Sequence, residues 1–141
     1  MLLDIGIKAE SISRLFQKQV SWQLRKHRIN DLNAVQAVVL LKIGKQEMSV
    51  GEVESRGIYL GSNPSYNIHA LVGNGYLDSF QDITDGRVRI LKVTPKGLDL
   101  YQELFPLFNI NTPVIQDYYN WLCGVEKFIG KCTQSYMEPH I

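Results

Sequence analysis

The side chains best suited to ligand chemistry are the charged residues of one short segment. Asp82 and Asp85 precede Arg87 and Arg89, and Asp85-Gly86 is a typical hairpin turn. Arginine guanidinium groups bind phosphate oxygens and enter narrow minor grooves of duplex DNA. Because Arg87 and Arg89 are two positions apart, they share one face of a strand near its tip. We therefore expect both to contact a nucleic-acid backbone or minor groove. The alternative is that they pair with Asp82 and Asp85 on the surface.

A polar helix is expected to precede this segment. Asn63 is a favourable N-cap, and Pro64 fits a first helical turn because its missing N–H would be unpaired there in any case. The spacing of Ile68, Leu71 and Val72 predicts a face that packs on the core. The candidate DNA-contact residues of this helix and its entry are Ser62, Asn63, Ser65, Tyr66, Asn67 and His69.

The outward face of this helix is polar but uncharged. Asn63 or Asn67 can pair bidentately with adenine, which indicates an A·T-leaning site read partly through DNA shape. Tyr66 can contact a phosphate or pack on a thymine methyl group. We therefore expect the helix to enter the major groove, with Ser62 to His69 facing the bases.

Two further helices are predicted from their capping residues. Asn33 with Gln36 has the spacing of a capping box and begins a helix over 34–43, which Gly44 ends. Ser49 with Glu52 repeats that spacing and begins a helix of about two turns, closed by Gly57.

Long amphipathic segments flank this unit. The spacing of apolar residues predicts a helix over about 9–27, and Thr94-Pro95 begins another, which Pro106 should kink or end. Thr112-Pro113 then begins a final helix. The C-terminal apolar sets are too broad for one core stripe, so we expect a subunit interface, with an intrachain bundle as the alternative.

Residues 33–97 resemble the multiple-antibiotic-resistance regulator (MarR) family of winged-helix transcription factors. The resemblance rests on Asp82-x-x-Asp85-x-Arg87, on Val93-Thr94-Pro95-Lys96-Gly97 and on Leu71-x-x-x-Gly75-Tyr76-Leu77. It implies an N-terminal helix and two C-terminal helices that intertwine to form a dimer. Tyr66 departs from the family pattern, which often has an arginine in this helix.

Length and composition fit one globular domain. The chain has 141 residues, of which 45% are hydrophobic and 21% charged. The expected class is mainly α with a small β wing, a winged helix-turn-helix in one domain over 1–141. Its DNA-binding core spans about 33–97, and its dimerisation helices span about 1–30 and 98–141.

Charge is unevenly distributed along the chain. The net charge is +1, which is low for a nucleic-acid binder. Between Lys8 and Arg28, however, six basic residues accompany one acidic residue, Glu10. This segment can also be an ordinary solvated helix face.

Other classes of protein have little support in the sequence. The histidines have no metal-ligand spacing with Cys123 or Cys132, and no phosphate-loop or nucleophile-elbow motif is present. We therefore expect no enzyme, no cofactor and no metal site, and free structural thiols. No apolar run is long enough for a membrane span and no secretion signal begins the chain, so a cytoplasmic location is expected.

The leading hypothesis is a homodimeric, sequence-specific regulator of transcription that binds double-stranded DNA at a near-palindromic promoter site. Two recognition helices would lie about 34 Å apart, one DNA turn. A small-molecule effector is possible, with Trp22, Tyr101 and Phe105 lining its pocket or simply belonging to the core. The alternatives are a winged-helix protein-interaction module without DNA affinity and, as a lesser idea, redox control through Cys123 or Cys132.

Overall fold

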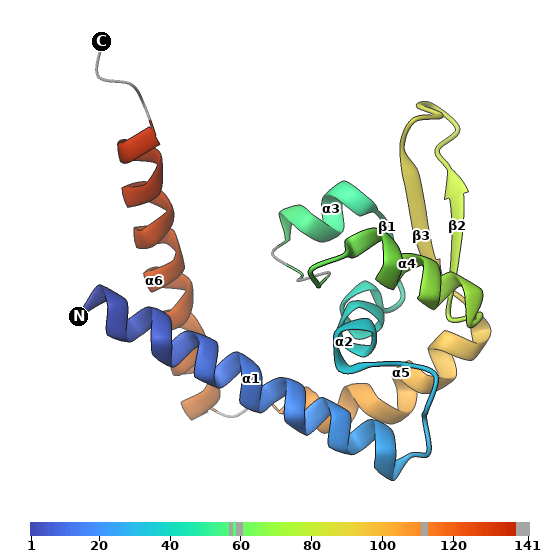
Figure 1. Cartoon of the computed structure of the whole chain (residues 1–141), viewed down its shortest axis with the longest axis horizontal. Helices are drawn as coiled ribbons and strands as arrows, with labels where there is room; N and C mark the ends of the chain where they lie inside the picture. The colour runs from blue at the N-terminus through green and yellow to red at the C-terminus, as the bar shows by residue number, and fades with distance from the viewer. Residues whose placement is uncertain (57, 59–60, 111–112, 138–141) are drawn as a thin grey trace. The chain divides into compact units, whose positions relative to one another are not determined.

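The computed structural model describes residues 1–56, 58, 61–110 and 113–137, which are mainly helical (Figure 1). In chain order the elements are α1 (Leu2–Lys26), α2 (Ala34–Ile43), β1 (Glu47–Ser49), α3 (Val50–Ser55), α4 (Pro64–Gly73), β2 (Leu77–Gln81), β3 (Arg89–Val93), α5 (Pro95–Phe108) and α6 (Pro113–Met137). Two compact units contain them, residues 1–105 and 106–141. The expected class, mainly α with a small β wing, is confirmed.

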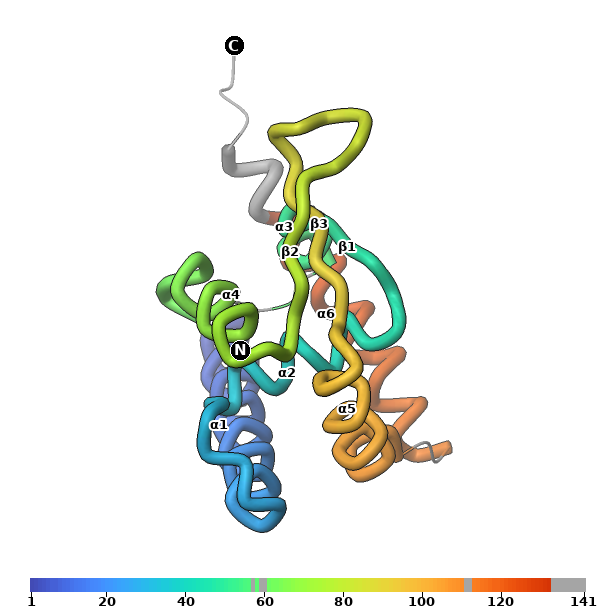
Figure 2. Tube along the Cα trace, turned by 90° about the vertical axis from the view of Figure 1, so that its right-hand side faces the viewer, coloured from blue at the N-terminus to red at the C-terminus, as the bar shows by residue number. Residues whose placement is uncertain are grey.

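The sheet is small and antiparallel, with strand order β1-β3-β2. Leu77 lies opposite Val93, Ser79 opposite Leu91 and Gln81 opposite Arg89. The β2–β3 hairpin projects beyond α3 and α4, as the two views in Figures 1 and 2 show. This projecting hairpin is the wing that the sequence predicts.

Local capping chemistry begins the helices as expected. In α2, Asn33 Oδ1 accepts from the Gln36 amide at 2.9 Å while Gln36 Oε1 accepts from the Asn33 amide at 3.0 Å. Ser49 and Glu52 form the same reciprocal pair at the start of α3. Helix α3 ends at Ser55, and the predicted stop at Gly57 lies outside the described residues.

Helix α2 is the centre of the first unit, where it contacts α1, α4 and β3. Ala37, Val39 and Leu40 have no exposed surface, because this helix is apolar on nearly every side. The other fully buried side chains include Leu71 of α4, Leu91 of β3 and Leu104 of α5. The core therefore fixes α4 and the sheet against the same helix.

Helix α1 begins earlier than the expected position 9 and has two different halves. Val20 and Leu24 near its end are buried, whereas Ile12 and Leu15 are 57% and 62% exposed. The regular apolar spacing predicted one packed face. Within the first unit, the C-terminal part of that face is the part that is buried.

Helix α5 begins at the expected cap, since the Gly97 amide donates to Thr94 Oγ1 at 3.1 Å. Pro106 lies inside the helix, which ends two residues later at Phe108. Tyr101 and Phe105 stack with their ring centroids 4.7 Å apart. No helix among the described residues is long and apolar enough to cross a membrane.

Helix α6 belongs to the second unit and is strongly amphipathic. The expected cap Thr112 lies outside the described residues. Large apolar side chains along this helix are exposed, namely Val114, Ile115, Tyr118, Tyr119, Trp121, Leu122 and Phe128. This exposed surface bears on the oligomeric state of the protein.

Candidate nucleic-acid interface

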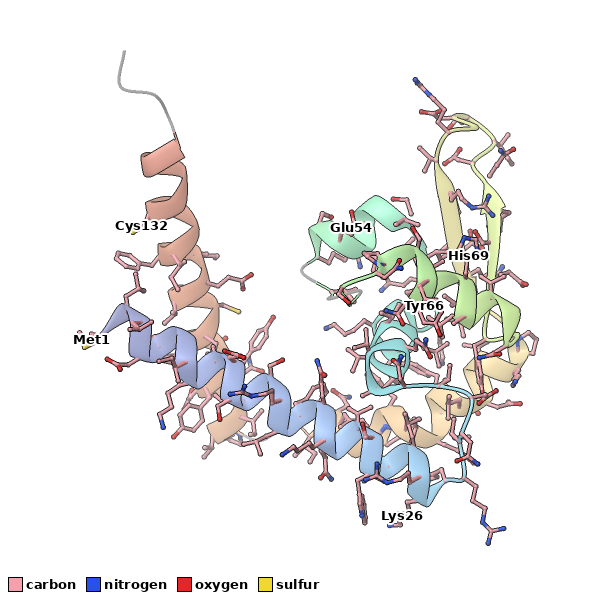
Figure 3. The ribbon with its side chains drawn as sticks, in the orientation of Figure 1. Met1, Lys26, Glu54, Tyr66, His69 and Cys132 are labelled. Atoms are coloured by element: carbon pink, nitrogen blue, oxygen red, sulfur yellow. The ribbon has the colours of Figure 1, made fainter. Side chains whose placement is uncertain are left out.

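Helix α4 presents a polar surface on the side away from the core. Asn63 begins it as predicted, because its Oδ1 accepts from the Tyr66 amide at 3.1 Å. Ser62, Ser65 and His69 are exposed, and Tyr66 is 63% exposed. Figure 3 shows Tyr66 and His69 on the same helix, with His69 beside the base of the hairpin. These side chains can reach a ligand without any rearrangement of the core.

Asn67 differs from the prediction, because it is 7% exposed and points inward. Its Oδ1 accepts from Gln36 Nε2 at 3.0 Å. Asn67 and Leu71 are one helical turn apart and therefore share the core-facing side of α4. Asn67 therefore links α4 to α2 and is not part of the exposed face of α4, unlike Asn63, the other asparagine expected to pair with adenine.

The segment before α4 passes close to this buried amide. Gly61 has a φ of +82°, and a Cβ at this position would lie 2.5 Å from Asn67 Nδ2. Glycine is favoured on both counts, since it tolerates positive φ and leaves room for the amide. The entry to α4 is thus adapted to the buried Gln36–Asn67 pair.

The tip of the hairpin is organised by its two carboxylates. Arg87 Nε lies 3.2 Å from Asp85 Oδ1, and the Arg87 side chain is 93% exposed. Asp82 Oδ1 accepts from the amide and the hydroxyl of Thr84, both at 2.7 Å, and these hydrogen bonds lower the pKa of Asp82. The surface pairing that was the alternative interpretation is therefore seen for Arg87 with Asp85, while Asp82 bonds to Thr84 within the turn.

Arg89 is held in a different way, because its Nε donates to Ser79 Oγ at 3.0 Å. In the register of the hairpin, Arg89 lies opposite Gln81 and diagonally from Ser79, on the same face of the sheet. That face also carries the buried Leu77, Leu91 and Val93. Arg89 therefore projects on the side of the hairpin that faces the helices. The sequence analysis did not include Ser79, although hairpin register could have paired it with Arg89.

A hydrogen-bond cluster around Asp31 sets the position of the helix exit, and the sequence analysis missed it. Asp31 Oδ1 accepts from the Tyr76 hydroxyl at 2.9 Å, and Lys96 Nζ lies 3.3 Å from Asp31 Oδ2. Lys96 Nζ also donates to the Asn74 carbonyl at 2.7 Å and lies 4.1 Å from the Tyr76 ring centroid. The cluster ties the α1–α2 loop to the turn after α4 and to the start of α5.

The pKa values of this cluster reflect these contacts. Burial of Tyr76 and its hydrogen bond to Asp31 raise the pKa of Tyr76 to about 12. Burial by itself would raise the pKa of Asp31, but the hydrogen bonds from Tyr76 and Lys96 outweigh it and the pKa is lowered. The carboxylate and the neutral phenol therefore stabilise each other.

Metal and thiol chemistry have little basis in the described residues. Among them, no group of three or more histidine, cysteine, aspartate or glutamate side chains lies close enough together to hold a metal ion. Cys123 and Cys132 are half-buried free thiols on α6. The polar face of α4 and the arginines of the hairpin are thus the main candidates for binding.

Comparison with known proteins finds a match for residues 32–97. Residues 32–97 match the family model of the winged helix DNA-binding domain. The exopolysaccharide II synthesis transcriptional activator ExpG of Rhizobium meliloti (strain 1021) is 38% identical over 91 residues, which make up 64% of this chain and 47% of the activator. The match therefore spans about half the length of that relative.

Solved structures extend the likeness to most of the chain. AbfR of Staphylococcus epidermidis has a TM-score of 0.75 at 14% identity, covering 91% of this chain and 92% of that protein. FabT of Streptococcus pneumoniae, solved in complex with DNA, has a TM-score of 0.62 at 18% identity, covering 92% and 98%. At these identities the likeness concerns the fold.

The matched family is one of DNA-binding domains, which agrees with the expectation that the chain is not an enzyme. Its bounds, 32–97, nearly coincide with the segment that resembles the MarR family. The capped helices α3 and α4, the projecting hairpin and the family match together confirm that resemblance. Residues 32–97 therefore match a winged helix DNA-binding domain, and the fold resembles that of MarR-like winged helix-turn-helix proteins.

Proposed function

We propose that this protein is a sequence-specific regulator of transcription that binds duplex DNA as a homodimer at a near-palindromic site. The observation that carries the proposal is the exposed polar face of α4 beside a hairpin with two exposed arginines. In such a domain the helix enters the major groove, and the hairpin contacts the backbone or the minor groove. Occupation of a promoter in this way changes access by polymerase.

The relatives support this role through what they are named for. ExpG is a transcriptional activator, and FabT was solved with DNA bound. We extend these roles to this chain because its residues 32–97 match the winged helix DNA-binding domain. A regulator of this kind must share a compartment with the DNA that it binds, which agrees with the expected cytoplasmic location.

The assignment of contacts follows from exposure. Ser62, Asn63, Ser65, Tyr66 and His69 would face the major groove from α4 and its entry. Arg87 would extend from the hairpin tip, where Asp85 contacts only the Nε of its guanidinium and the side chain stays 93% exposed. Since α4 carries no charged side chain on this face, most of the electrostatic attraction would come from elsewhere, including the wing.

Exposed apolar side chains support the homodimer. Ile12, Leu15 and Phe16 of α1 and a broad set on α6 are 42% or more exposed in a single chain. Apolar patches of this extent are typical of surfaces that are covered in an assembly. We therefore propose that α1 and α6 form the subunit interface, as the family resemblance implies.

Selection of bound duplexes from a random DNA pool tests the proposal. We expect enrichment of a near-palindrome whose half-sites are about one helical turn apart, roughly 34 Å. Sedimentation of the free protein should give twice the mass of the chain. Enrichment of a single unrepeated half-site by a monomer would contradict the dimer, and no enrichment even at low salt would contradict DNA binding.

The second candidate is a winged-helix module that binds a protein partner without DNA affinity. The net charge of +1 and the uncharged face of α4 favour it. The salt dependence separates the two functions, because a DNA reader loses affinity with a log-log slope near −0.9 for each phosphate neutralised. If the affinity for DNA did not change with salt concentration, this result would support the module that binds a protein partner.

A further inference from the structure

A groove of about 250 Å³ lies between α4 and the hairpin. Its polar side chains are Ser65 and His69 of α4 and Ser79 and Arg89 of the hairpin, and Ile68 and Val72 contribute apolar surface. Figure 3 shows His69 on the side of α4 that faces the strands. Two elements that are separate in the sequence thus present four hydrogen-bonding side chains to one space.

The position of Arg89 at this groove is built into the hairpin. Leu91, two residues further along β3, is completely buried on the face that carries Ser79. Strand alternation places Arg89 on this same face, where the core ends and the groove begins. The hydrogen bond from Nε to Ser79 then orients the guanidinium and leaves its two terminal NH₂ groups as donors.

The charge of the groove favours an anion. No aspartate or glutamate belongs to its lining. Among the ion pairs of the described residues, Arg87 has a carboxylate partner in Asp85, whereas none involves Arg89. The guanidinium, the imidazole and the two hydroxyl groups can all donate hydrogen bonds. Proteins commonly bind phosphate oxygens with a guanidinium group and neighbouring hydroxyl donors.

We propose that this groove seats one phosphodiester group of the DNA backbone in each half-site, held by Arg89 with His69, Ser65 and Ser79. The inference rests on the proposed function, since the DNA reaches the groove when α4 lies in the major groove. It separates the roles of the two arginines: Arg89 binds a fixed phosphate beside α4, while Arg87 acts at the tip of the hairpin. A phosphate bound here also joins the helix to the wing.

The test uses the full chain and a selected duplex in which single phosphates are replaced, one at a time, by uncharged methylphosphonates. We expect one replacement per half-site to weaken binding of the natural protein and to have no further effect on the Arg89→Ala variant. Arg89→Ala should also flatten the log-log salt slope by about 0.9 for each half-site bound. His69→Gln should reduce the effect of the same replacement.

Arg87→Ala is the matched control, because it removes an equal charge from the same hairpin. It should keep the full effect of the replacement that Arg89→Ala abolishes. Circular dichroism of both variants should match the natural protein, since both arginines are exposed.

The outcomes distinguish the inference from the proposed function. If the natural protein binds DNA but every methylphosphonate weakens the natural protein and Arg89→Ala equally, the groove does not hold a phosphate, and DNA reading stands. If the natural protein retains no duplex at any salt concentration, both the proposed function and this inference are overturned.

Discussion

The hydroxyl of Tyr76 donates a hydrogen bond of 2.9 Å to the carboxylate of Asp31, 45 positions earlier in the chain. Tyr76 directly follows the turn that ends α4, and Asp31 lies in the loop between α1 and α2. Lys96, at the start of α5, binds the same carboxylate. This contact fixes where α4 ends relative to the helices on both sides of the winged helix domain.

Tyr76→Phe should destabilise the fold by about 1 kcal/mol, near the low end for a hydrogen bond to a charged group, because water can reach the partly exposed Asp31. Chemical denaturation followed by circular dichroism measures this change. Tyr66→Phe is the control, since the Tyr66 side chain is largely exposed, and should leave stability unchanged. Equal stability of the two variants would show that the Asp31 contact contributes nothing.

The same pair predicts how stability depends on pH. The lowered pKa of Asp31 stabilises the fold above its ordinary value of 3.8, and this contribution is lost as pH falls through the folded pKa. The pKa of Tyr76, raised from 10.0 to about 12, gives a contribution that is lost as pH rises between these values. Between pH 9 and about 12, the free energy of unfolding of Tyr76→Phe should therefore fall less steeply with pH than that of the natural protein. The difference in slope should correspond to the release of one proton on unfolding. Parallel curves would contradict the assignment.

Asn67→Ala should lower the free energy of unfolding by about 1–3 kcal/mol, because it leaves the buried Gln36 amide without its partner. Ser65→Ala, on the exposed side of the same helix, is the control for stability. The base preference selected by the Asn67→Ala variant should remain that of the natural protein. A changed preference at one base pair would return Asn67 to the reading surface.

Gly97→Ala should destabilise the fold by about 1–3 kcal/mol, although alanine is the better helix former. A Cβ at this position would overlap the Tyr76 carbonyl oxygen and lie 2.6 Å from Val93 Cγ1. Gly73→Ala at the end of α4 is the matched control, because its Cβ would have open space, and it should be neutral or stabilising. Thermal unfolding of both variants measures the difference. Equal midpoints would show that the α5 junction can widen.

Arg87→Ala should weaken DNA binding and flatten the log-log salt slope by about 0.9 per half-site, if the guanidinium lies against a phosphate. Asp85→Asn should keep the slope of the natural protein, because it leaves the arginine in place. Fluorescence anisotropy with the selected duplex at several salt concentrations gives both slopes. An unchanged slope with lower affinity for A·T-rich sites would instead indicate a minor-groove contact.

Features that depend on neighbouring residues could be predicted from the sequence. The caps at Asn33, Ser49, Asn63 and Thr94 each join groups three positions apart, so residue type and spacing are sufficient to define them. The hairpin turn follows from Asp85-Gly86 for the same reason. Motif spacing also identified the winged helix, because its elements are short and follow one another directly.

Features that depend on the packing of distant elements could not be predicted in this way. Helical periodicity placed Asn67 at the edge of an outward face, but the position of α2 beside α4 made Gln36 its partner, 31 positions away. From the sequence, Arg87 and Arg89 were expected to act in the same way. In the structure, the sheet register places Arg89 on the face towards α4, whereas Arg87 lies at the tip. The sequence by itself determined which elements form, because capping and turn formation are local. The tertiary structure decided which side chains remain available to a ligand, because burial depends on contacts between residues far apart in the chain.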